Sequence, residues 1–300
     1  METVLITGGS GLIGSRLSSK LSEAGYRVAL LSRKPEEDSP WQVFSWDIQK
    51  GTIDPGAVEC ADYIIHLAGA NIGEKRWTES RKKEIVGSRV KSTELLFKYF
   101  AGSGKLKAFI SASATGWYGA VTSDKIFTEE DPAADDFLGQ TCRYWEEAAG
   151  MFEKSGFRTS MIRTGIVLSP GGGALGKMAL PVRLGVGSAL GSGRQYMPWV
   201  HLDDLCNIYL RAISDNNFHG AYNAVAPGHV NGKEFVSVIA KTLRKPLWFP
   251  NVPAFMLRAI FGELAVMLLE GSRVSPDKLL KTGFSFNYPD LGSALEQLYS

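Results

Sequence analysis

A run of glycines between a short apolar segment and an amphipathic one constrains this chain more than any other feature. Residues 3–7 are β-branched and nearly all apolar, which predicts a strand buried on both faces of a parallel sheet. Thr-Gly-Gly-Ser-Gly-Leu-Ile-Gly follows at residues 7–14, and apolar residues then recur every four positions to Leu21, as in a helix. Glycines at this spacing allow a tight turn, let a pyrophosphate approach the backbone and let the helix pack closely. The sequence therefore predicts a dinucleotide site in preference to a plain surface turn, with contacts from Gly8, Ser10, Gly11, Leu12, Ile13 and Gly14.

The residues after the second expected strand, 27–31, indicate which dinucleotide binds. Sites specific for NAD place an acidic residue at this point, where it accepts a hydrogen bond from the ribose 2′-hydroxyl. This chain has Ser32, Arg33 and Lys34 instead. A guanidinium offers a planar pair of donors to a 2′-phosphate, and Lys34 adds a second positive charge. We expect NADP(H) as the cofactor; the alternative is that both cations are solvated loop residues.

Strand and helix patterns alternate along the first half of the chain. Apolar runs at 63–67, 108–111 and 159–163 indicate further strands, and residues 86–100 carry apolar side chains at helical spacing. This alternation predicts an α/β fold, a Rossmann-type doubly wound parallel sheet. Such a sheet binds its ligands at the carboxyl ends of the strands.

The last third has a different character. Residues 170–198 are rich in glycine with little periodicity, and helical patterns separated by proline-rich turns follow at 233–242 and 253–270. We expect residues 1–169, with 199–226 returning to them, to form an NADP-binding Rossmann domain. Residues 170–198 and 227–300 are expected to form a small, mostly helical C-terminal substrate or lid region that packs on it.

Charge and cysteine content narrow the classes of partner and compartment. The 33 Lys and Arg residues against 31 Asp and Glu leave a formal charge of +2, too little to attract nucleic acid or an anionic membrane, so neither partner is expected. The longest apolar stretch, 255–269, contains Arg258 and Glu263, which favours a buried helix over a membrane span. Three widely spaced cysteines and the lack of a signal-peptide pattern favour the cytoplasm. Nothing in the sequence indicates an oligomeric state.

Several further motifs together resemble one superfamily. They are Trp46-Asp47-Ile48, His66-Leu67-Ala68-Gly69, Lys75-Arg76-Trp77, Ser113-Ala-Thr-Gly-Trp-Tyr-Gly119, Trp145-Glu146, Arg163-Thr-Gly-Ile-Val-Leu168 and Gly191-Ser-Gly-Arg-Gln-Tyr-Met-Pro-Trp-Val-His201. With the glycine loop, they resemble the extended short-chain dehydrogenases/reductases. More narrowly, they are similar to the atypical branch labelled epimerase family protein or nucleoside-diphosphate-sugar epimerase, over nearly the whole chain.

The resemblance implies further cofactor contacts. It places Asp47 near the adenine, and Leu67, Ala68 and Gly69 along the adenine ribose and pyrophosphate. It also places Glu84 and Arg89, on the following helix, and Val167 against the cofactor. Arg89 could otherwise be an exposed helix charge.

The catalytic pair of the superfamily is missing. Short-chain dehydrogenases use Tyr-x-x-x-Lys, in which lysine lowers the tyrosine pKa for proton transfer during hydride transfer. No tyrosine of this chain has a lysine four positions later, and the two superfamily positions fall near Leu138 and Cys142. Ser113 remains, and Tyr118 is the best substitute proton donor, so we assign both as catalytic candidates. An equal alternative is that Tyr118 is a hydrogen-bonded wall of the pocket.

Polar and aromatic residues are expected on the substrate side: Trp77, Arg194, Tyr196 and Trp199. In related sugar-nucleotide enzymes the corresponding loop supplies an arginine to the diphosphate, a role that Arg194 could fill by bidentate hydrogen bonding. His201, Asp203 and Asp204 could form a catalytic or metal site, but we expect them to brace the loop and open a helix, with Asp203 as the candidate N-cap. The four histidines are scattered without cysteines at ligand spacing, so no metal site is expected.

Two functions remain open from the sequence. The first is an NADP(H)-binding oxidoreductase or epimerase-like protein that acts on a small polar substrate such as a nucleotide sugar. The alternative is a non-catalytic NADPH-binding regulator or assembly protein, which the absence of the Tyr-x-x-x-Lys pair favours. Apolar side chains around the nicotinamide would indicate the second, and polar groups within hydrogen-bond reach would indicate the first.

Overall fold

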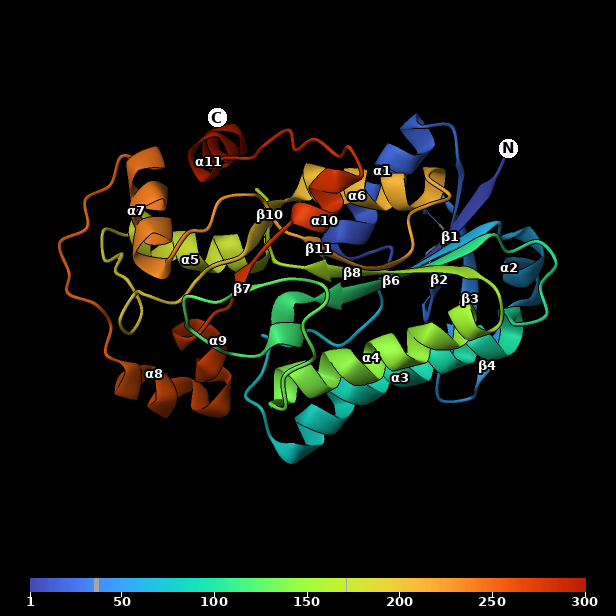
Figure 1. Cartoon of the computed structure of the whole chain (residues 1–300), viewed down its shortest axis with the longest axis horizontal. Coiled ribbons are helices and arrows are strands. Elements are labelled where there is room, and N and C mark those ends of the chain that lie inside the picture. Colours follow the sequence, from blue (N-terminus) through green and yellow to red (C-terminus); the bar gives the residue numbers. More distant parts are fainter. Residues whose placement is uncertain (35–37, 171) are drawn as a thin grey trace.

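The computed structural model describes residues 1–34, 38–170 and 172–300, and an eight-stranded sheet forms its centre (Figure 1). The sheet is parallel except for the pairing of the last two strands in its spatial order. That order is β11 (Gly220–Ala224), β8 (Arg158–Thr164), β6 (Ala108–Ala114), β5 (Tyr63–His66), β1 (Thr3–Thr7), β2 (Arg27–Ser32), β3 (Gln42–Asp47) and β4 (Thr52–Ile53). The chain crosses over at β1, which pairs with β2 on one side and β5 on the other. The α/β, doubly wound prediction is therefore confirmed.

Alternate side chains of β1 supply two separate hydrophobic cores. Val4 and Ile6 pack toward α1 (Leu12–Glu23) and α6 (Leu202–Ser214), whereas Leu5 packs toward the opposite layer. That layer contains α2 (Pro55–Cys60), α3 (Glu79–Phe100) and α4 (Phe137–Lys154), and Figure 1 shows α3 and α4 side by side below the sheet. Every residue of β1 is buried, as the unbroken apolar run predicts.

The C-terminal part surrounds a third core. It gathers apolar side chains of α5 (Gly173–Arg183), α7 (Gly232–Thr242) and α11 (Leu291–Tyr299), together with Leu168 and Trp199. These last two lie on a small parallel pair, β9 (Ile166–Leu168) and β10 (Trp199–His201). Because the core joins residues from both predicted regions, the C-terminal part packs on the sheet domain; its role as a lid and the exact division at 169/170, 198/199 and 226/227 stay predictions.

The expected helix at 253–270 is interrupted in the structure. It consists of α8 (Ala254–Phe261), the short 3-10 helix η2 (Gly262–Ala265) and α9 (Val266–Leu269). Gly262 has a φ of 62°, a left-handed conformation that ends α8, and the approach of the Arg76 guanidinium leaves little room for a side chain there. The remaining elements are η1 (Thr115–Tyr118), β7 (Ile126–Phe127), β12 (Arg273–Val274) and α10 (Asp277–Lys281).

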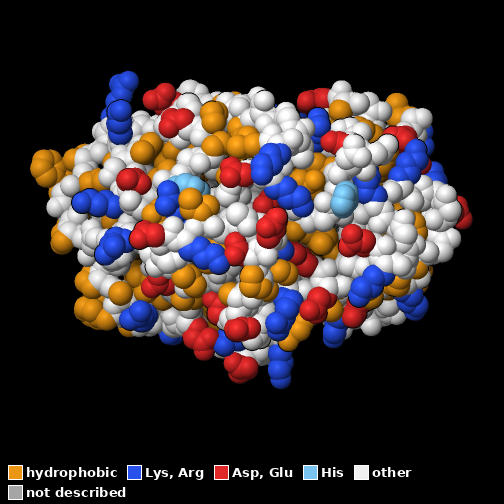
Figure 2. Space-filling model, viewed as in Figure 1, with side chains coloured by type: hydrophobic (Ala, Val, Ile, Leu, Met, Phe, Trp, Pro, Cys, Tyr) orange, Lys and Arg blue, Asp and Glu red, His pale blue; other side chains and the backbone are white. Residues whose placement is uncertain are grey.

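Charged side chains of both signs are interspersed over the face shown in Figure 2, and apolar groups gather toward the end that carries α7 and α8. Within the ranges that the structure describes, no helix is both long and apolar enough to cross a bilayer.

Candidate functional site

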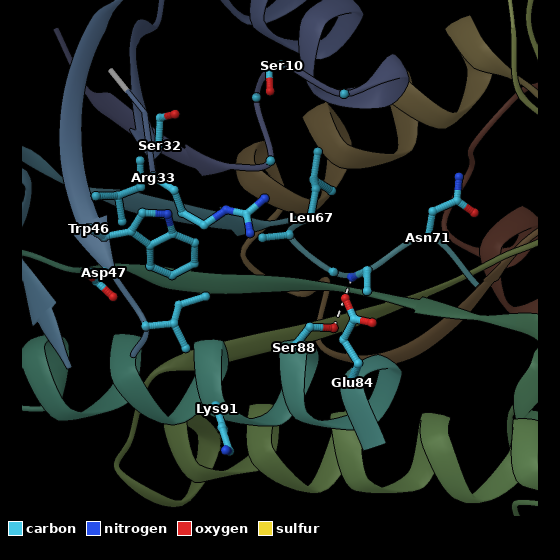
Figure 3. A pocket seen from close by; sticks show the side chains of 18 of the residues that line it. Ser10, Ser32, Arg33, Trp46, Asp47, Leu67, Asn71, Glu84, Ser88 and Lys91 are labelled. Carbon is cyan, nitrogen blue, oxygen red and sulfur yellow. Dashed lines mark hydrogen bonds between the residues drawn. The ribbon is translucent and has the colours of Figure 1, made fainter. Parts of the chain in front are cut away.

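A cavity of about 720 Å³ lies at the carboxyl ends of β1, β2, β3 and β5 (Figure 3). The glycine loop, the end of β2, the end of β3, the loop after β5 and one face of α3 form its walls. A parallel sheet opens such a crevice where its strand order reverses, which here is at β1. The predicted residues that the cavity brings together are Gly8, Ser10, Gly11, Ser32, Arg33, Asp47, Leu67, Ala68, Gly69 and Glu84.

The glycine loop forms a cradle that side chains would fill. Gly8 has a φ of 72°, and a Cβ there would lie 3.1 Å from the Ala68 nitrogen. A Cβ on Gly14 would lie 2.3 Å from the Gly8 carbonyl oxygen, so the first turn of α1 packs directly on the loop. The N-cap, Gly11, has no side chain that could accept hydrogen bonds, so it leaves the first backbone N–H groups of α1 uncapped. The cradle has the geometry that a pyrophosphate requires.

The end of β2 supplies a cation to the cavity. In Figure 3 the Arg33 guanidinium lies between the Trp46 ring and Leu67. Next to it, Ser32 is held by a hydrogen bond from its hydroxyl to the Lys34 carbonyl oxygen, at 2.8 Å. Lys34 itself does not line the cavity, and residues 35–37 lie outside the described ranges.

An acidic residue is present at the end of β3, but local partners hold it. The Asp47 carboxylate accepts hydrogen bonds from the backbone nitrogens of Gln49 at 2.8 Å and Lys50 at 3.0 Å. The hydrogen bond from Lys50, followed by that from Gln49, lowers the pKa of Asp47. The Asp47 carboxylate therefore stays ionised, and its hydrogen bonds lie at the end of the strand. Asp47 lines the side of the cavity where the resemblance places the adenine.

Residues from the loop after β5 and from α3 form the opposite wall. Arg81 is 7% exposed and donates to Glu84 at 2.6 Å and to the Asn71 carbonyl oxygen at 2.6 Å. The Ala70 nitrogen donates to the Ser88 hydroxyl at 3.0 Å, the hydrogen bond drawn in Figure 3. These contacts fix the loop against the helix, so this wall is rigid.

Arg89 lies behind the wall, next to Gly69. Its guanidinium donates to the carbonyl oxygens of Ala70 at 3.1 Å and Ile85 at 2.9 Å, and it lies over the Trp145 ring at 4.9 Å. Burial lowers its pKa, yet an arginine retains its proton, so a positive charge remains behind the loop. Six of the residues expected at the cofactor are not part of the cavity wall. They are Leu12, Ile13, Gly14, Lys34, Arg89 and Val167.

Sequence reasoning missed several residues of the cavity. They include Trp46, Asn71, Glu74, Arg81, Lys83, Ser88 and Lys91. On α3, positions 84, 87, 88 and 91 follow the spacing of one helix face, a signal that was available in the sequence. A polar helix face is more often solvated than part of a site, which is why the pattern alone did not identify it.

Ser113 and Tyr118 belong to a buried polar network. The Ser113 hydroxyl donates to Glu146 at 2.6 Å, and Arg163 binds both oxygens of Glu146 at 2.9 Å each. Arg163 also donates to the Tyr118 hydroxyl at 3.1 Å, and that hydroxyl donates to Asn223 at 2.7 Å. Burial raises the pKa of Tyr118 to about 12, and only 1% of its side chain is exposed. These contacts favour the interpretation of Tyr118 as a hydrogen-bonded structural residue.

The two positions of the superfamily catalytic pair carry side chains without ready proton chemistry. Leu138 and Cys142 both pack close to Gly116, directly after β6. Burial raises the pKa of the Cys142 thiol to about 12, so the thiol stays protonated at neutral pH. Neither side chain can exchange a proton with a substrate near neutral pH.

A second cavity, of about 520 Å³, lies between α4 and the α8–α9 segment. Among the four predicted substrate residues, Trp77 lines this cavity. Arg194 is exposed on its loop, Tyr196 lines a cleft of only about 10 Å³, and Trp199 is 1% exposed within β10. The structure therefore does not bring these four residues together.

The segment after β10 opens α6, as expected, but Asp203 lies in the first turn of this helix and is not its N-cap. His201 is the N-cap of α6 and accepts from the Asp203 nitrogen at 3.1 Å, and Asp203 pairs with Arg16 at 2.7 Å. In the described part of the chain, no three His, Cys, Asp or Glu side chains gather closely enough to bind a metal ion.

Comparisons with known proteins agree with this geometry. Residues 4–225 match the NAD dependent epimerase/dehydratase family, and residues 252–298 match a domain of unknown function (DUF1731). The "Epimerase family protein SDR39U1" of Homo sapiens is 36% identical over 301 residues, which cover 98% of this chain and 99% of the human protein. The "Epimerase family protein MT2273" of Mycobacterium tuberculosis is 38% identical over 293 residues, covering 97% and 96% of the two chains.

Solved structures give the same result. The crystal structure of human SDR39U1 (isoform 2) with NADPH superposes with a TM-score of 0.89 and covers 99% of both chains. The nucleoside-diphosphate sugar epimerase from Corynebacterium glutamicum, 33% identical, superposes with a TM-score of 0.81 over 99% of this chain and 58% of its own length. These findings confirm the resemblance drawn from the motifs. This chain belongs to the NAD dependent epimerase/dehydratase family.

Proposed function

We propose that this protein binds NADPH in the 720 Å³ cavity. The observation that carries the proposal is the position of Arg33, whose guanidinium reaches into the cavity from the end of β2. At that point a 2′-phosphate would find a planar pair of donors, whereas an NAD site would hold a carboxylate. The crystal structure of a relative 36% identical with NADPH supports the same cofactor.

The glycine cradle fits the rest of the coenzyme. Gly8, Gly11 and Gly14 leave room for a pyrophosphate at the first turn of α1, and Trp46 and Asp47 line the side expected to hold the adenine. When bound, NADPH supplies a hydride from its nicotinamide. The residues of this chain hold and orient it; Arg89, behind Gly69, adds a positive charge near the diphosphate.

We expect Arg33→Ala to reduce the affinity for NADPH about tenfold or more and to leave the affinity for NADH within about twofold, because only NADPH carries the phosphate. Fluorescence titration of each coenzyme measures both constants. Arg27→Ala is the matched control, since Arg27 is an exposed arginine at the opposite end of the same strand. Equal losses for both coenzymes, or no preference in the unaltered protein, would refute the assignment of Arg33.

Redox turnover of a small substrate is the second candidate function, and the second cavity is the observation that favours it. Within this proposal Ser113 is the remaining catalytic candidate of the two, Tyr118 is expected to be structural because its hydroxyl is buried and bonded to Asn223, and Trp77 is the candidate substrate contact. Arg194, Tyr196 and Trp199 are not needed for it. Coenzyme binding without turnover is the competing proposal, supported by Leu138, Cys142 and the engaged hydroxyls of the buried network.

A screen of mixed aldehydes and ketones, followed by loss of NADPH fluorescence, separates the two. If turnover is found, we expect Tyr118→Phe to retain it, because the hydroxyl is buried and its pKa is raised to about 12. A loss of more than about tenfold in a variant that is still fully folded at the assay temperature would instead identify Tyr118 as the proton donor.

A further inference from the structure

One end of the molecule exposes large apolar side chains. Two segments form it: residues 173–194, which contain α5, and residues 241–262, which contain α8. They expose eight such side chains, which are Leu180, Leu184, Val186, Trp248, Phe249, Phe255, Met256 and Ile260. The exposed fraction is 70% at Leu184, 71% at Phe255 and 79% at Trp248, so these side chains stand out into the solvent. Exposed apolar groups that gather in this way mark an interaction surface.

The two segments lie side by side and form one surface. The Gly191 nitrogen donates to the Val252 carbonyl oxygen at 2.9 Å, and the Ser188 hydroxyl donates to the Pro250 carbonyl oxygen at 2.5 Å. Helix α8 begins two residues after Val252. We call this surface the α5–α8 end. Figure 2 shows apolar and basic side chains together at the end of the molecule where Figure 1 labels α7 and α8.

The charged side chains of the α5–α8 end are all positive. The two segments contain no Asp or Glu, and their seven cations are exposed: Lys177, Arg183, Arg194, Lys241, Arg244, Lys245 and Arg258. Within the part of the chain that the structure describes, none of the seven forms an ion pair. Of the 33 Lys and Arg residues, the other 26 stand against 31 Asp and Glu. The small net charge of the chain therefore conceals a positive end and a negative remainder.

Carboxylates of neighbouring elements offset only part of this positive charge. Arg258 lines the second cavity together with Asp136, Glu263 and Glu270, so its charge is compensated there. Six cations of the α5–α8 end remain when Arg258 is set aside. Three of them lie within residues 241–245, directly before the exposed Trp248 and Phe249. Positive charge and exposed aromatic rings therefore occur side by side on the same loop.

This combination favours a lipid surface over a protein partner. A second copy bound through the same face would bring the cations of both copies together, and like charges at an interface repel. Peptide partners are usually held in a groove or along the edge of a sheet. Trp248, Phe249 and Phe255 line none of the three cavities described above. A bilayer needs no groove, because aromatic rings enter the headgroup region while Lys and Arg contact anionic lipids.

We propose that the α5–α8 end binds the surface of a membrane that contains anionic lipids. Trp248, Phe249 and Phe255 enter the headgroup region, and Arg244 and Lys245 contact the lipid phosphates. The expectation of no membrane partner came from the net charge of the whole chain. Attraction to a lipid surface depends instead on the charge within about 10 Å of it, which at this end is positive. The proposal goes beyond coenzyme binding, since the coenzyme cavity contains none of these residues.

Flotation with lipid vesicles tests the proposal. We expect the protein to float with phosphatidylcholine vesicles that contain about one third phosphatidylserine, and at least about tenfold less with phosphatidylcholine alone. Raising the salt concentration to about 0.5 M should weaken binding severalfold, because salt screens the charges. Absence of binding to the anionic vesicles at low salt, or equal binding to both kinds of vesicle, would overturn the proposal.

Charge reversal locates the binding surface. Arg244→Glu combined with Lys245→Glu should reduce binding to the anionic vesicles about tenfold or more. The matched control is Lys98→Glu combined with Lys154→Glu, which makes the same change in net charge at exposed lysines of α3 and α4. The control should bind within about threefold of the unaltered protein. Equal losses in the two double variants would show that this end has no special role and would overturn the proposal.

Trp248 reports directly on the contact. Its emission should shift to shorter wavelength when vesicles are added, because the ring leaves water. Trp248→Phe should lose most of this shift and keep binding within about threefold, since an aromatic ring remains. Trp248→Ser combined with Phe255→Ser should weaken binding about tenfold, whereas Tyr144→Ser, at an exposed aromatic residue of α4, should not. A shift that persists in Trp248→Phe would place the contact elsewhere and refute the assignment.

Poly-glutamate represents the competing class, an acidic protein partner. Tight binding of poly-glutamate without binding of anionic vesicles would identify that class and overturn the proposal. NADPH affinities within about twofold of the unaltered protein and melting temperatures within about 3 °C show that each variant is folded. Vesicle binding without NADPH binding would contradict the coenzyme assignment alone, so the two proposals fail separately.

Discussion

His66 shows how a single buried side chain supports the coenzyme site. Thr7 accepts from the Leu67 and Ala68 nitrogens at 3.2 Å each, so its own proton is free for the Nδ1 of His66, 2.6 Å away. The Nε2–H of His66 then donates to Ser92 at 2.9 Å. One neutral imidazole thus joins β1, β5 and α3 directly behind the cavity wall. Its place in a motif was visible in the sequence, but its partners were not.

The burial of His66 makes stability depend on pH. Desolvation lowers its pKa from 6.5 to about 3, so below pH 6.5 the unfolded chain takes up a proton that the folded protein excludes. The contribution to stability is complete above pH 6.5 and decreases as the pH falls toward 3. We expect His66→Gln to remove this dependence, about 1.4 kcal/mol per pH unit at most.

Urea unfolding between about pH 6 and pH 4 measures this slope. His219→Gln, at an exposed histidine, is the control and should leave the slope unchanged. An identical pH dependence in His66→Gln and the unaltered protein would show that His66 is not the responsible group.

At the scale of elements, the buried ion pair joins parts of the sheet to the helix that covers it. Arg163 on β8 and Glu146 on α4 are 3% and 7% exposed, and Ser113 on β6 shares the same carboxylate. Removing one partner of such a pair leaves a buried charge without compensation. The network therefore fixes α4 on the sheet next to the end of β6.

We expect Glu146→Gln to lower the free energy of unfolding by about 3–5 kcal/mol, since Arg163 would remain charged and buried. Tyr118→Phe should cost about 1–2 kcal/mol, the value of hydrogen bonds to one hydroxyl. Glu147→Gln is the matched control on the exposed side of α4 and should change stability by less than about 0.5 kcal/mol. Chemical denaturation ranks the three variants; equal values for Glu146→Gln and Glu147→Gln would exclude this role of the pair.

The sequence predicted five strands of the sheet and the helices α1, α3 and α7, but it missed other elements, among them α4 and α11. Every residue of β1 and β5 is buried, and β2, β6 and β8 contain runs of buried residues, so their patterns identify them. β3 mixes exposed and buried residues and was not expected as a strand. The break coincides with the positive φ of Gly262, and the approach of Arg76 to this glycine became visible only in the structure.

At the scale of the whole molecule, the C-terminal segment is tied back to the sheet domain. The Asp204 carboxylate on α6 has no exposed surface and accepts from the backbone nitrogens of Asn287 at 2.9 Å and Tyr288 at 3.0 Å. His201 contacts Gln297 on α11 at 3.0 Å. The C-terminal segment and the sheet domain therefore share polar contacts as well as the third hydrophobic core.

We expect Asp204→Asn to lower the free energy of unfolding by about 1–3 kcal/mol. The NH2 group of the asparagine would face a backbone N–H group and could not accept a hydrogen bond from it. Limited proteolysis should then cut faster between residues 282 and 290, and Asp135→Asn, at an exposed aspartate, should not change the rate. Faster cutting in both variants, or in neither, would contradict the proposed tie.

The sequence by itself determined the coenzyme loop, the alternation of strands and helices, and the family, because these depend on residue types at short spacing. Only the tertiary structure decided which distant side chains meet. It buried Ser113 and Tyr118 with Arg163 and Glu146, left Arg194 on the surface, and placed Trp77 in the wall of the second cavity. The physical reason is that glycine conformation and apolar periodicity are local properties. Burial and electrostatic environment, in contrast, arise from segments that are brought together only by folding.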